Sequence, residues 1–207
     1  MKLNWLGRAS LNNSARATMQ RRVAASLMSR LGGRVNGGRA LEVGCGRGVG
    51  VEIIVDVFEP AKVFAFDLDR KMVRLARPRL GSRAEVLGLA VADARAIPVR
   101  DSCFDAVFDF GAIHLIPRWR EALSEVRRVL SPGGKYFFEL VTSRLLRAPY
   151  PLLTDGFRSM PAPRPEEFLA ELKRNRIVVE PRGVVRLRFA ALSGFVGDLV
   201  GVGTAVP

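Results

Sequence analysis

The chain has 207 residues, of which 48% are hydrophobic and 26% are charged. This length suits a single domain with a core large enough for an α/β fold, and the composition excludes a disordered or collagen-like chain. The formal net charge is +13, and residues 1–41 carry eight basic side chains and no acid. Such an excess attracts nucleic acid, anionic lipid or an acidic substrate, or it forms a solvated surface. Because the basic residues are dispersed along the chain and few aromatics lie among them, we favour the solvated surface.

The cysteine content and the apolar segments indicate the compartment. Cys45 and Cys103 are too few for a disulfide framework or a zinc site, so we expect no metal centre and a reduced, cytoplasmic location. The first ten residues lack the apolar core of a signal peptide. Residues 189–205 are apolar, but Asp198 and four glycines interrupt them, and they fall short of the roughly 20 residues that span a membrane. We therefore expect buried terminal strands there and no transmembrane segment.

The first predicted element is an amphipathic helix over residues 14–31. Its apolar residues recur at a spacing of four, at Ala15, Met19, Val23, Leu27 and Leu31. Strand and helix patterns then alternate, with helices closed by Pro60 and Pro78 and a turn at S-P-G-G (131–134). The strands fall within 40–43, 63–66, 86–91, 104–110 and 135–140, and the helices lie around 49–58, 72–76 and 118–130.

The order of these elements predicts the fold. Strands separated by single helices are parallel neighbours joined by right-handed crossovers. After residue 141 the pattern loosens into a proline-rich segment, a helix near 166–175 and two runs, 177–189 and 195–205, compatible with a hairpin. We expect an α/β fold with a doubly wound, Rossmann-like, seven-stranded sheet, mostly parallel, closed by an antiparallel C-terminal hairpin. The single domain 1–207 divides into a helical cap (1–37), a ligand-binding core (38–141), an insertion over the sheet edge (142–176) and C-terminal strands (177–207).

A glycine-rich loop, L-E-V-G-C-G-R-G-V-G at residues 41–50, follows the first strand and precedes a helix. In a doubly wound sheet this position binds the ligand, and glycines there let a ligand approach the backbone closely. The spacing Gly44-x-Gly46-x-Gly48 brings the third glycine one residue earlier than the dinucleotide fingerprint does. Glu42 precedes the loop, where a carboxylate would repel a pyrophosphate and attract a cation.

Two more carboxylates follow neighbouring strands. Asp67 ends the second strand, where its two oxygens can accept hydrogen bonds from the two hydroxyls of a ribose. Asp93 follows the third strand and could accept a hydrogen bond from an exocyclic amine. The expected ligand therefore has a ribose, an adenine-like amine and a cationic end, and makes no demand for phosphate binding.

Five segments together resemble a known family. They are E-V-G-C-G-R-G (42–48), F-D-L-D (66–69), A-D-A-R-A-I-P (92–98), F-D-A-V-F-D-F-G-A-I-H (104–114) and R-V-L-S-P-G-G (128–134). In this order and spacing, over about residues 38–141, they resemble the class I S-adenosylmethionine-dependent methyltransferases. The nearest type is the group with the ubiquinone- and menaquinone-biosynthesis methyltransferases. The resemblance implies S-adenosylmethionine as cofactor and S-adenosylhomocysteine as product.

The resemblance also implies where the methionine end of the cofactor lies. By position, Gly44, Cys45, Gly46 and Gly48 would line it. Glu42 would orient the loop and attract the ammonium group. Phe110 and Gly111, which follow the fourth strand, would form the floor of the pocket beside the sulfonium.

The adenosine end is implied in the same way. Asp67 would hold both ribose hydroxyls, and Leu68 and Met72 would pack near the adenine. Asp93 and Ala94 would receive the edge of the base. Each residue also has a local interpretation; Met72, for example, fits an ordinary core position equally well.

The lone histidine, His114, is the candidate catalytic residue. It lies four residues after Phe110, and an unperturbed imidazole titrates close to neutral pH, as a general base for a protonated acceptor should. The alternative is a histidine that packs locally at the start of a helix.

The methyl acceptor is approached by elimination. The segment after the fourth strand, D-F-G-A (109–112), lacks the Asp/Asn-Pro-Pro-aromatic turn of amine methyltransferases, and the Pro-Cys of cytosine-C5 enzymes is missing. The first hypothesis is a small-molecule or lipid-like acceptor, held by apolar residues and by arginines of the cap and the insertion. These candidates are Trp5, Leu6, Leu152, Phe157 and Met160, with Arg16, Arg144 and Arg147.

Two alternatives stay open. The basic surface could serve an RNA (rRNA or tRNA) methyltransferase, whose binding would weaken with salt. A non-catalytic cofactor-binding or membrane-surface module, using the basic N-terminal helix for peripheral membrane contact, is the third hypothesis. The oligomeric state is not indicated by the sequence.

Overall fold

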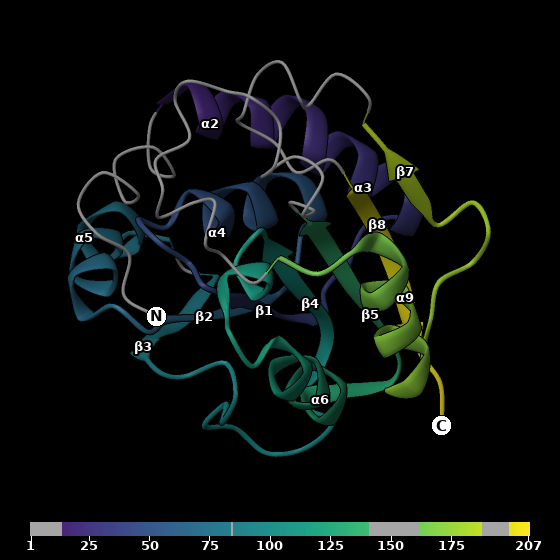
Figure 1. The fold of residues 1–207 in the computed structure, drawn as a ribbon. Helices are drawn as coiled ribbons and strands as arrows, with labels where there is room; N and C mark the ends of the chain where they lie inside the picture. The colour runs from purple at the N-terminus through teal and green to yellow at the C-terminus, as the bar shows by residue number, and fades with distance from the viewer. Residues whose placement is uncertain (1–13, 84, 141–161, 188–198) are drawn as a thin grey trace, which may run out of the picture.

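The computed structural model describes residues 14–83, 85–140, 162–187 and 199–207. A central eight-stranded sheet runs through the molecule (Figure 1). Its strands are β1 (Arg39–Val43), β2 (Lys62–Asp67), β3 (Val86–Val91), β4 (Phe104–Phe110), β5 (Leu130–Leu140), β6 (Ile177–Val178), β7 (Val184–Arg186) and β8 (Leu199–Ala205).

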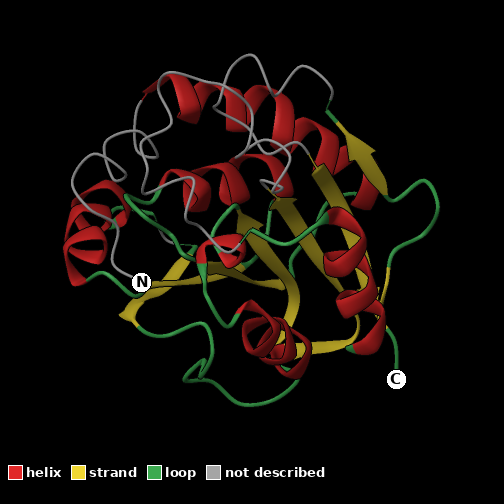
Figure 2. Ribbon diagram, in the orientation of Figure 1, coloured by secondary structure: helices red, strands yellow, loops and turns green. Residues whose placement is uncertain are grey.

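Helices cover both faces of the sheet (Figure 2). The first helical segment consists of α2 (Ser14–Met19), the π-helix η1 (Gln20–Ala24) and α3 (Ala25–Gly32). It packs on one face together with α4 (Val49–Ile53), its π-helical continuation η2 (Ile54–Phe58) and α5 (Arg70–Leu80). The opposite face carries α6 (Trp119–Val129) and α9 (Pro165–Arg174), and the 3-10 helix η3 (Ile113–Leu115) lies beyond β4. The result is a three-layer α/β/α architecture.

The strand order is β3-β2-β1-β4-β5-β8-β6, with β7 paired to β8. Strands β1 to β5 are parallel, and β8 runs antiparallel to β5, β6 and β7. This confirms the predicted doubly wound sheet with antiparallel C-terminal strands. The predicted run 177–189 is broken by a turn in which the Gly183 amide donates to the Glu180 carbonyl at 2.7 Å. Two short strands, β6 and β7, therefore pair with β8, which brings the strand count to eight.

Two predicted boundaries differ from the structure. Pro78 lies inside α5, which ends two residues later at Leu80. Residues 131–134 do not separate α6 from the strand, because β5 starts at Leu130 and its pairing with β4 shifts register between Phe104 and Ala106. Proline near a helix end removes one hydrogen bond only, and a bulge absorbs extra residues without ending a strand.

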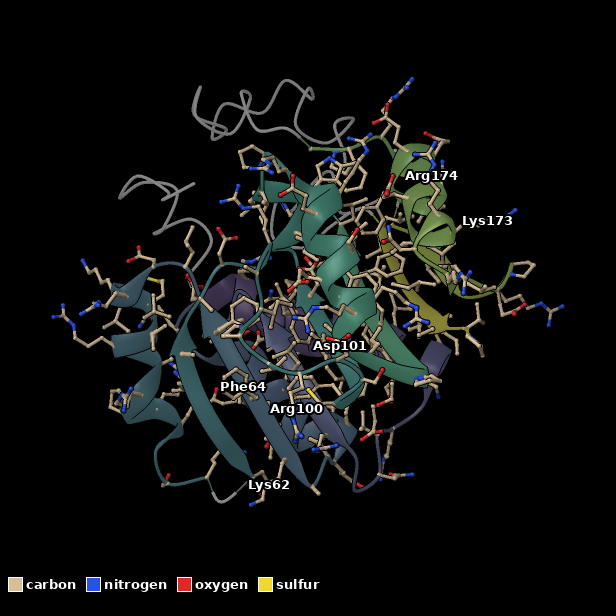
Figure 3. The ribbon with its side chains drawn as sticks, turned by 90° about the horizontal axis from the view of Figure 1, so that it is seen from below. Lys62, Phe64, Arg100, Asp101, Lys173 and Arg174 are labelled. Carbon is tan, nitrogen blue, oxygen red and sulfur yellow. The ribbon has the colours of Figure 1, made fainter. Side chains whose placement is uncertain are left out.

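Aromatic rings fill the core on both faces of the sheet. Phe108 of β4 stacks on Phe137 of β5 at a centroid distance of 4.5 Å, and Phe58 of η2 meets these two rings edge-on at 4.6 and 5.1 Å. On the other face, Phe168 of α9 packs against Phe138 and Trp119 at 5.3 and 5.8 Å. Charged side chains lie on the outside, and the view from below labels the exposed Lys62, Arg100, Asp101, Lys173 and Arg174 (Figure 3).

Parts of the predicted domain plan lie outside the described residues. These are residues 1–13 of the cap, most of the insertion and residues 188–198. They include Trp5, Leu6, Arg144, Arg147, Leu152, Phe157 and Met160, and also Asn12 and Asn13, either of which could cap the first predicted helix. The four-part division of the chain stays a prediction. Among the described helices, none has the length and apolar character needed to cross a bilayer.

The aromatic cluster is expected to carry much of the stability. Phe108 is fully buried, so Phe108→Ala leaves a cavity between η2 and the sheet. We expect the free energy of unfolding to fall by about 3–5 kcal/mol, measured by urea denaturation. Leu75→Ala, at an exposed position of α5, is the control and should change it by less than about 0.5 kcal/mol. Equal effects of the two substitutions would contradict this account of the core.

Candidate functional site

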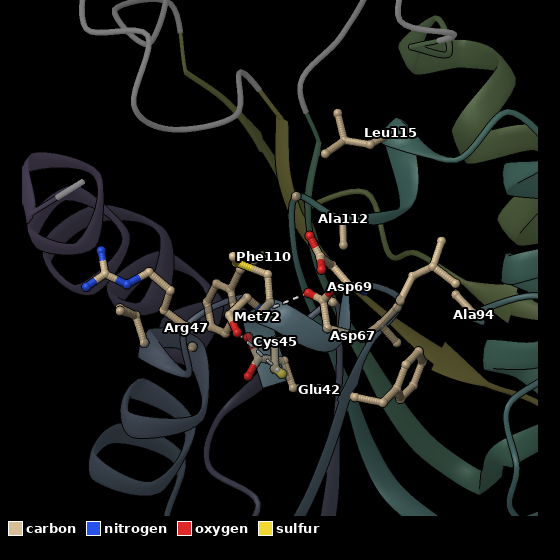
Figure 4. A pocket seen from close by; sticks show the side chains of 18 of the residues that line it. Glu42, Cys45, Arg47, Asp67, Asp69, Met72, Ala94, Phe110, Ala112 and Leu115 are labelled. Carbon is tan, nitrogen blue, oxygen red and sulfur yellow. Dashed lines mark hydrogen bonds between the residues drawn. The ribbon is translucent and has the colours of Figure 1, made fainter. Parts of the chain in front are cut away.

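A cavity of about 640 Å³ opens at the carboxyl ends of β1, β2 and β4, beside the point where the strand order reverses. Doubly wound sheets bind ligands at this place, and the volume suits a small molecule. Most of the predicted cofactor-binding residues line the cavity (Figure 4). They are Glu42, Gly44, Cys45, Gly46, Asp67, Leu68, Met72, Asp93, Ala94, Phe110 and Gly111.

The glycine loop joins β1 to α4 along one wall of the cavity. Gly44 has a φ of +73°, and a Cβ there would overlap the side chain of Ala112 beyond β4, so only glycine fits. Gly48 has a φ of +86° and precedes α4, but it does not line the cavity. A Cβ at Gly48 would instead meet Leu80 of α5 at 2.9 Å. Its position suits the packing of α4 against α5 rather than the expected contact with the methionine end.

Asp67, the last residue of β2, connects the glycine loop with the start of α5. Its Oδ2 accepts a hydrogen bond from the Gly46 amide at 2.9 Å, and its Oδ1 accepts one from the Asp69 amide at 2.8 Å. Burial raises the pKa of Asp67. Each carboxylate oxygen can accept more than one hydrogen bond, so both can still receive a diol. The next acid, Asp69, caps α5 by accepting from the Lys71 amide at 2.9 Å.

Glu42 lies at the inner end of the cavity and is 2% exposed. A Cβ at Gly50 would overlap its Oε1, and its Oε2 has no hydrogen-bond partner among the described residues. Burial raises the pKa of Glu42 to about 8, with further contributions from Asp67 and Asp109. The backbone of Val51 donates a hydrogen bond to this carboxyl group, but a buried carboxyl oxygen that lacks a partner favours a cationic ligand group. Together with the glycine cradle and the Asp67 oxygens, it fits the cofactor that the sequence resemblance implies.

Cys45 and Asp93 complete the cofactor side of the cavity. Cys45 is buried, and burial raises the pKa of its thiol, so it is an inert small residue. Asp93 is already engaged, because both of its oxygens accept from Arg95, with the shortest distance, 2.6 Å, between Oδ2 and Nη2. This pairing lowers the pKa of Asp93. An adenine amine would have to share the Asp93 carboxylate with Arg95 or displace Arg95 from it. The sequence analysis did not anticipate this competition.

The opposite wall of the cavity comes from the N-terminal helix and from the segment after β4. Arg16 of α2 is 5% exposed, and its Nη2 donates to the Phe110 carbonyl at 3.1 Å. Gln20 of η1 donates to the same carbonyl at 3.3 Å. Arg16 also forms an ion pair with Glu139 of β5 at 3.6 Å. Arg16 therefore lines the cavity as expected, but its guanidinium is anchored to the sheet rather than exposed toward an acidic acceptor group.

A second buried acid, Asp109, fixes the turn after β4. Its Oδ1 accepts from the Ala112 amide at 2.5 Å and from the Ile113 amide at 3.3 Å, and its Oδ2 accepts from the Tyr136 hydroxyl at 3.1 Å. Burial raises the pKa of Asp109 to about 7. Asp109 thus holds Phe110 and Gly111 in place from behind.

His114, the candidate base, is 3% exposed and does not line the cavity. Burial and the neighbouring Arg16 charge lower its pKa to about 3, and its Nδ1 has no hydrogen-bond partner among the described residues. A group with so low a pKa is a weak base at neutral pH. The base role of His114 stays a prediction, and this geometry favours the packing alternative.

The sequence analysis missed the roles of Asp109, Glu139 and Gly50. The sequence contained a usable signal, since Asp109 and Glu139 each lie between apolar neighbours near the end of a strand, in F-D-F and F-E-L. A buried acid needs a partner, so such positions predict polar contacts. Within the described ranges, no three histidine, cysteine or acidic side chains gather into a candidate metal site.

The raised pKa of Glu42 predicts a pH effect on stability. The folded protein retains a proton on Glu42 up to about pH 8, whereas the unfolded chain loses it near pH 4.5. The contribution of Glu42 to the free energy of unfolding is thus fully present below about pH 4.5 and is lost as the pH rises through about 8. We expect Glu42→Gln to make the fall in Tm over this interval shallower, in thermal unfolding without ligand. Glu180→Gln, at an exposed position, is the control and should match the wild type; a Glu42→Gln curve parallel to the wild type would rule the effect out.

The Arg16–Glu139 pair predicts a coupling between the N-terminal helix and the sheet. Arg16→Met removes the cation from a fully buried carboxylate, so we expect the free energy of unfolding to fall by about 3–5 kcal/mol. In Arg16→Met/Glu139→Gln, part of this loss should be recovered, and urea denaturation of the set gives the coupling energy. Additive losses in the double variant would show that the two side chains do not interact.

Comparison with known proteins agrees with this geometry. A family model described as a methyltransferase domain matches residues 41–138. The fatty-acid O-methyltransferase of Mycolicibacterium smegmatis is 39% identical over 106 residues, covering 50% of this chain and 37% of that protein. The malonyl-[acyl-carrier protein] O-methyltransferase of Geobacter sulfurreducens is 34% identical over 151 residues, covering 71% of this chain and 56% of that protein. The chain thus spans between about a third and just over half of the length of these relatives.

The fold has close structural neighbours as well. A S-adenosylmethionine-dependent methyltransferase from Aquifex aeolicus superposes with a TM-score of 0.75 at 20% identity, covering 99% of this chain and all of that one. The family model covers residues 41–138, which include the glycine loop and Asp67 of the cavity. Residues 41–138 thus form a methyltransferase domain of the type 11 group of class I S-adenosylmethionine-dependent enzymes, whose cofactor is S-adenosylmethionine.

Proposed function

We propose that this protein transfers the methyl group of S-adenosylmethionine to a carboxylate oxygen of a lipid-like acceptor. The observation that carries the proposal is the character of the cavity wall opposite the glycine loop. This wall is mainly apolar and contains one anchored arginine. When bound, the cofactor supplies a methyl group already activated by the sulfonium, so the task of the protein is mainly to align the reactants.

The cofactor side of the cavity has a role for each acid. Asp67 would accept hydrogen bonds from the ribose hydroxyls while it keeps its bonds to the loop amides. Glu42 would face the ammonium group, whose positive charge favours the ionised form of this acid. Leu68, which is 42% exposed, and Met72 would gain cover from the adenine.

Among the described residues, the acceptor side offers apolar surface and no base. Its described lining residues are Ala17, Thr18, Gln20, Ala112, Leu115, Ile116 and Pro117, besides Arg16. None of these is a histidine, a lysine or an acid. A carboxylic acid is ionised at neutral pH and needs no base, whereas an alcohol or a phenol would have to lose a proton. The wall therefore favours a carboxylate acceptor with an apolar chain.

The relatives support this acceptor class. Two of them are named as O-methyltransferases of a fatty acid and of malonyl-acyl carrier protein. Both of these acceptors carry a carboxyl group. The match covers the methyltransferase core and only part of each relative, so the acceptor of this protein has to be tested directly.

The test is a transfer assay with tritiated S-adenosylmethionine and three acceptors: hexadecanoic acid, hexadecanol and bulk RNA. We expect label only in the acid, as a methyl ester that is cleaved by base. Transfer to the alcohol or the RNA, without transfer to the acid, would refute the carboxylate acceptor.

Cofactor binding is measured separately, so that the two parts of the proposal can fail independently. By calorimetry with S-adenosylhomocysteine, Asp67→Asn should weaken binding at least about tenfold, because one oxygen that accepts from the diol becomes a donor. The exposed Asp101→Asn is the matched control and should bind as the wild type does. Binding that is insensitive to Asp67 would refute the cofactor site itself.

A further inference from the structure

Helix α5 presents an apolar face to the sheet and a mainly basic face to solvent. Its buried residues are Met72, Val73, Ala76 and Leu80. Its remaining positions are exposed and include Arg70, Lys71, Arg74, Leu75, Arg77 and Pro78. The helix contains no acidic residue. We name the exposed side chains of Arg70, Lys71, Arg74, Leu75 and Arg77 the α5 surface.

The cations of the α5 surface are not neutralised by neighbours. None of its four basic side chains forms an ion pair within the part of the chain that the structure describes. The adjacent Arg79 and Arg83 do form such pairs, with Glu52 and Asp56 at 2.9 and 2.8 Å. Helix α9 also pairs its arginines, Arg164 with Glu167 and Arg174 with Glu171. The α5 surface is therefore a region of uncompensated positive charge.

The α5 surface also contains an apolar group and lies beside the cavity. Leu75, which is 41% exposed, projects from the same solvent side as Lys71 and Arg74. The first turn of the helix borders the cavity through Asp69 and Met72. Helix α5 is at one end of the sheet, and α9 is at the other (Figure 1). A partner on the α5 surface would thus be held near the cofactor side of the pocket.

We propose that the α5 surface docks on an anionic lipid bilayer. Uncompensated cations complement the negative charge of such a surface, and an exposed leucine among them can enter the headgroup region. RNA fits less well, because base stacking uses aromatic side chains, and α5 contains none. This docking site differs from the basic N-terminal helix considered at first. In that helix Arg16 is buried, Arg21 is paired with Asp56, and only Arg22 and Arg30 are exposed without such a pair among the described residues.

The proposal does not depend on the acceptor, because vesicle binding is measured without methyl transfer. The probe is a sedimentation assay with vesicles of phosphatidylcholine alone or mixed with phosphatidylglycerol. The wild type should sediment with the mixed vesicles only, and added salt should release it. Each lysine or arginine near an anionic surface changes the partition by about fivefold, so several together have a large effect.

Two variants with the same loss of charge locate the contact. The first is Arg70→Gln/Lys71→Gln/Arg74→Gln/Arg77→Gln on α5. The second is Arg164→Gln/Lys173→Gln/Arg174→Gln/Arg186→Gln, which removes three arginines and one lysine around α9, where Figure 3 shows Lys173 and Arg174. We expect the α5 variant to lose more than about 100-fold in partition and the α9 variant less than about tenfold. Thermal unfolding confirms that both variants are folded.

Three results would overturn the proposal. Equal losses in the two variants would mean that net charge alone governs binding. Failure of the folded wild type to sediment with the mixed vesicles would exclude the bilayer. The third result is displacement of the protein from the vesicles by bulk RNA, at a concentration below the lipid concentration that gives half-maximal binding. If the α5 variant also lost RNA binding, the surface would be assigned to nucleic acid instead.

Discussion

Acidic side chains at the carboxyl ends of four adjacent strands set the electrostatics of the ligand-binding edge of the sheet. Glu42, Asp67, Asp109 and Glu139 lie at or near the ends of β1, β2, β4 and β5, all within one edge of the sheet. Asp67 and Asp109 accept hydrogen bonds from backbone amides, and Glu139 pairs with the Arg16 cation. The Oε2 of Glu42 has no hydrogen-bond partner among the described residues, and Glu42 lines the cavity, where it can face a cationic ligand group.

Most of the sheet could be predicted because its strands are short apolar runs separated by glycine and proline. β3 and β4 have the bounds that the sequence indicated, and β1 and β2 differ by a residue at their ends. The errors arose where the local preference of a residue, such as that of proline to end a helix, is weaker than the packing of the whole element. Pro78 does not end α5, because that helix is held on the sheet by Met72, Val73 and Ala76.

The site divides in the same way. Residues whose role follows from the backbone position, such as Gly44 and Asp67, could be placed from the sequence, because strand ends and the loop between them have a fixed geometry in this fold. Contacts between distant segments could not. No spacing rule relates Arg16 to Glu139 or Gln20 to the Phe110 carbonyl, since these contacts depend on how side chains fill one particular space.

The bond between Arg16 and the Phe110 carbonyl joins residues 94 positions apart in the chain. During synthesis at about 5–20 residues per second, the N-terminal helix therefore waits on the order of 5–20 s for its partner to emerge from the ribosome. Throughout that interval its apolar side, with Ala24, Ala25 and Met28, lacks the completed sheet that buries it in the folded protein. The nascent chain therefore exposes this apolar surface until β4 and β5 are made.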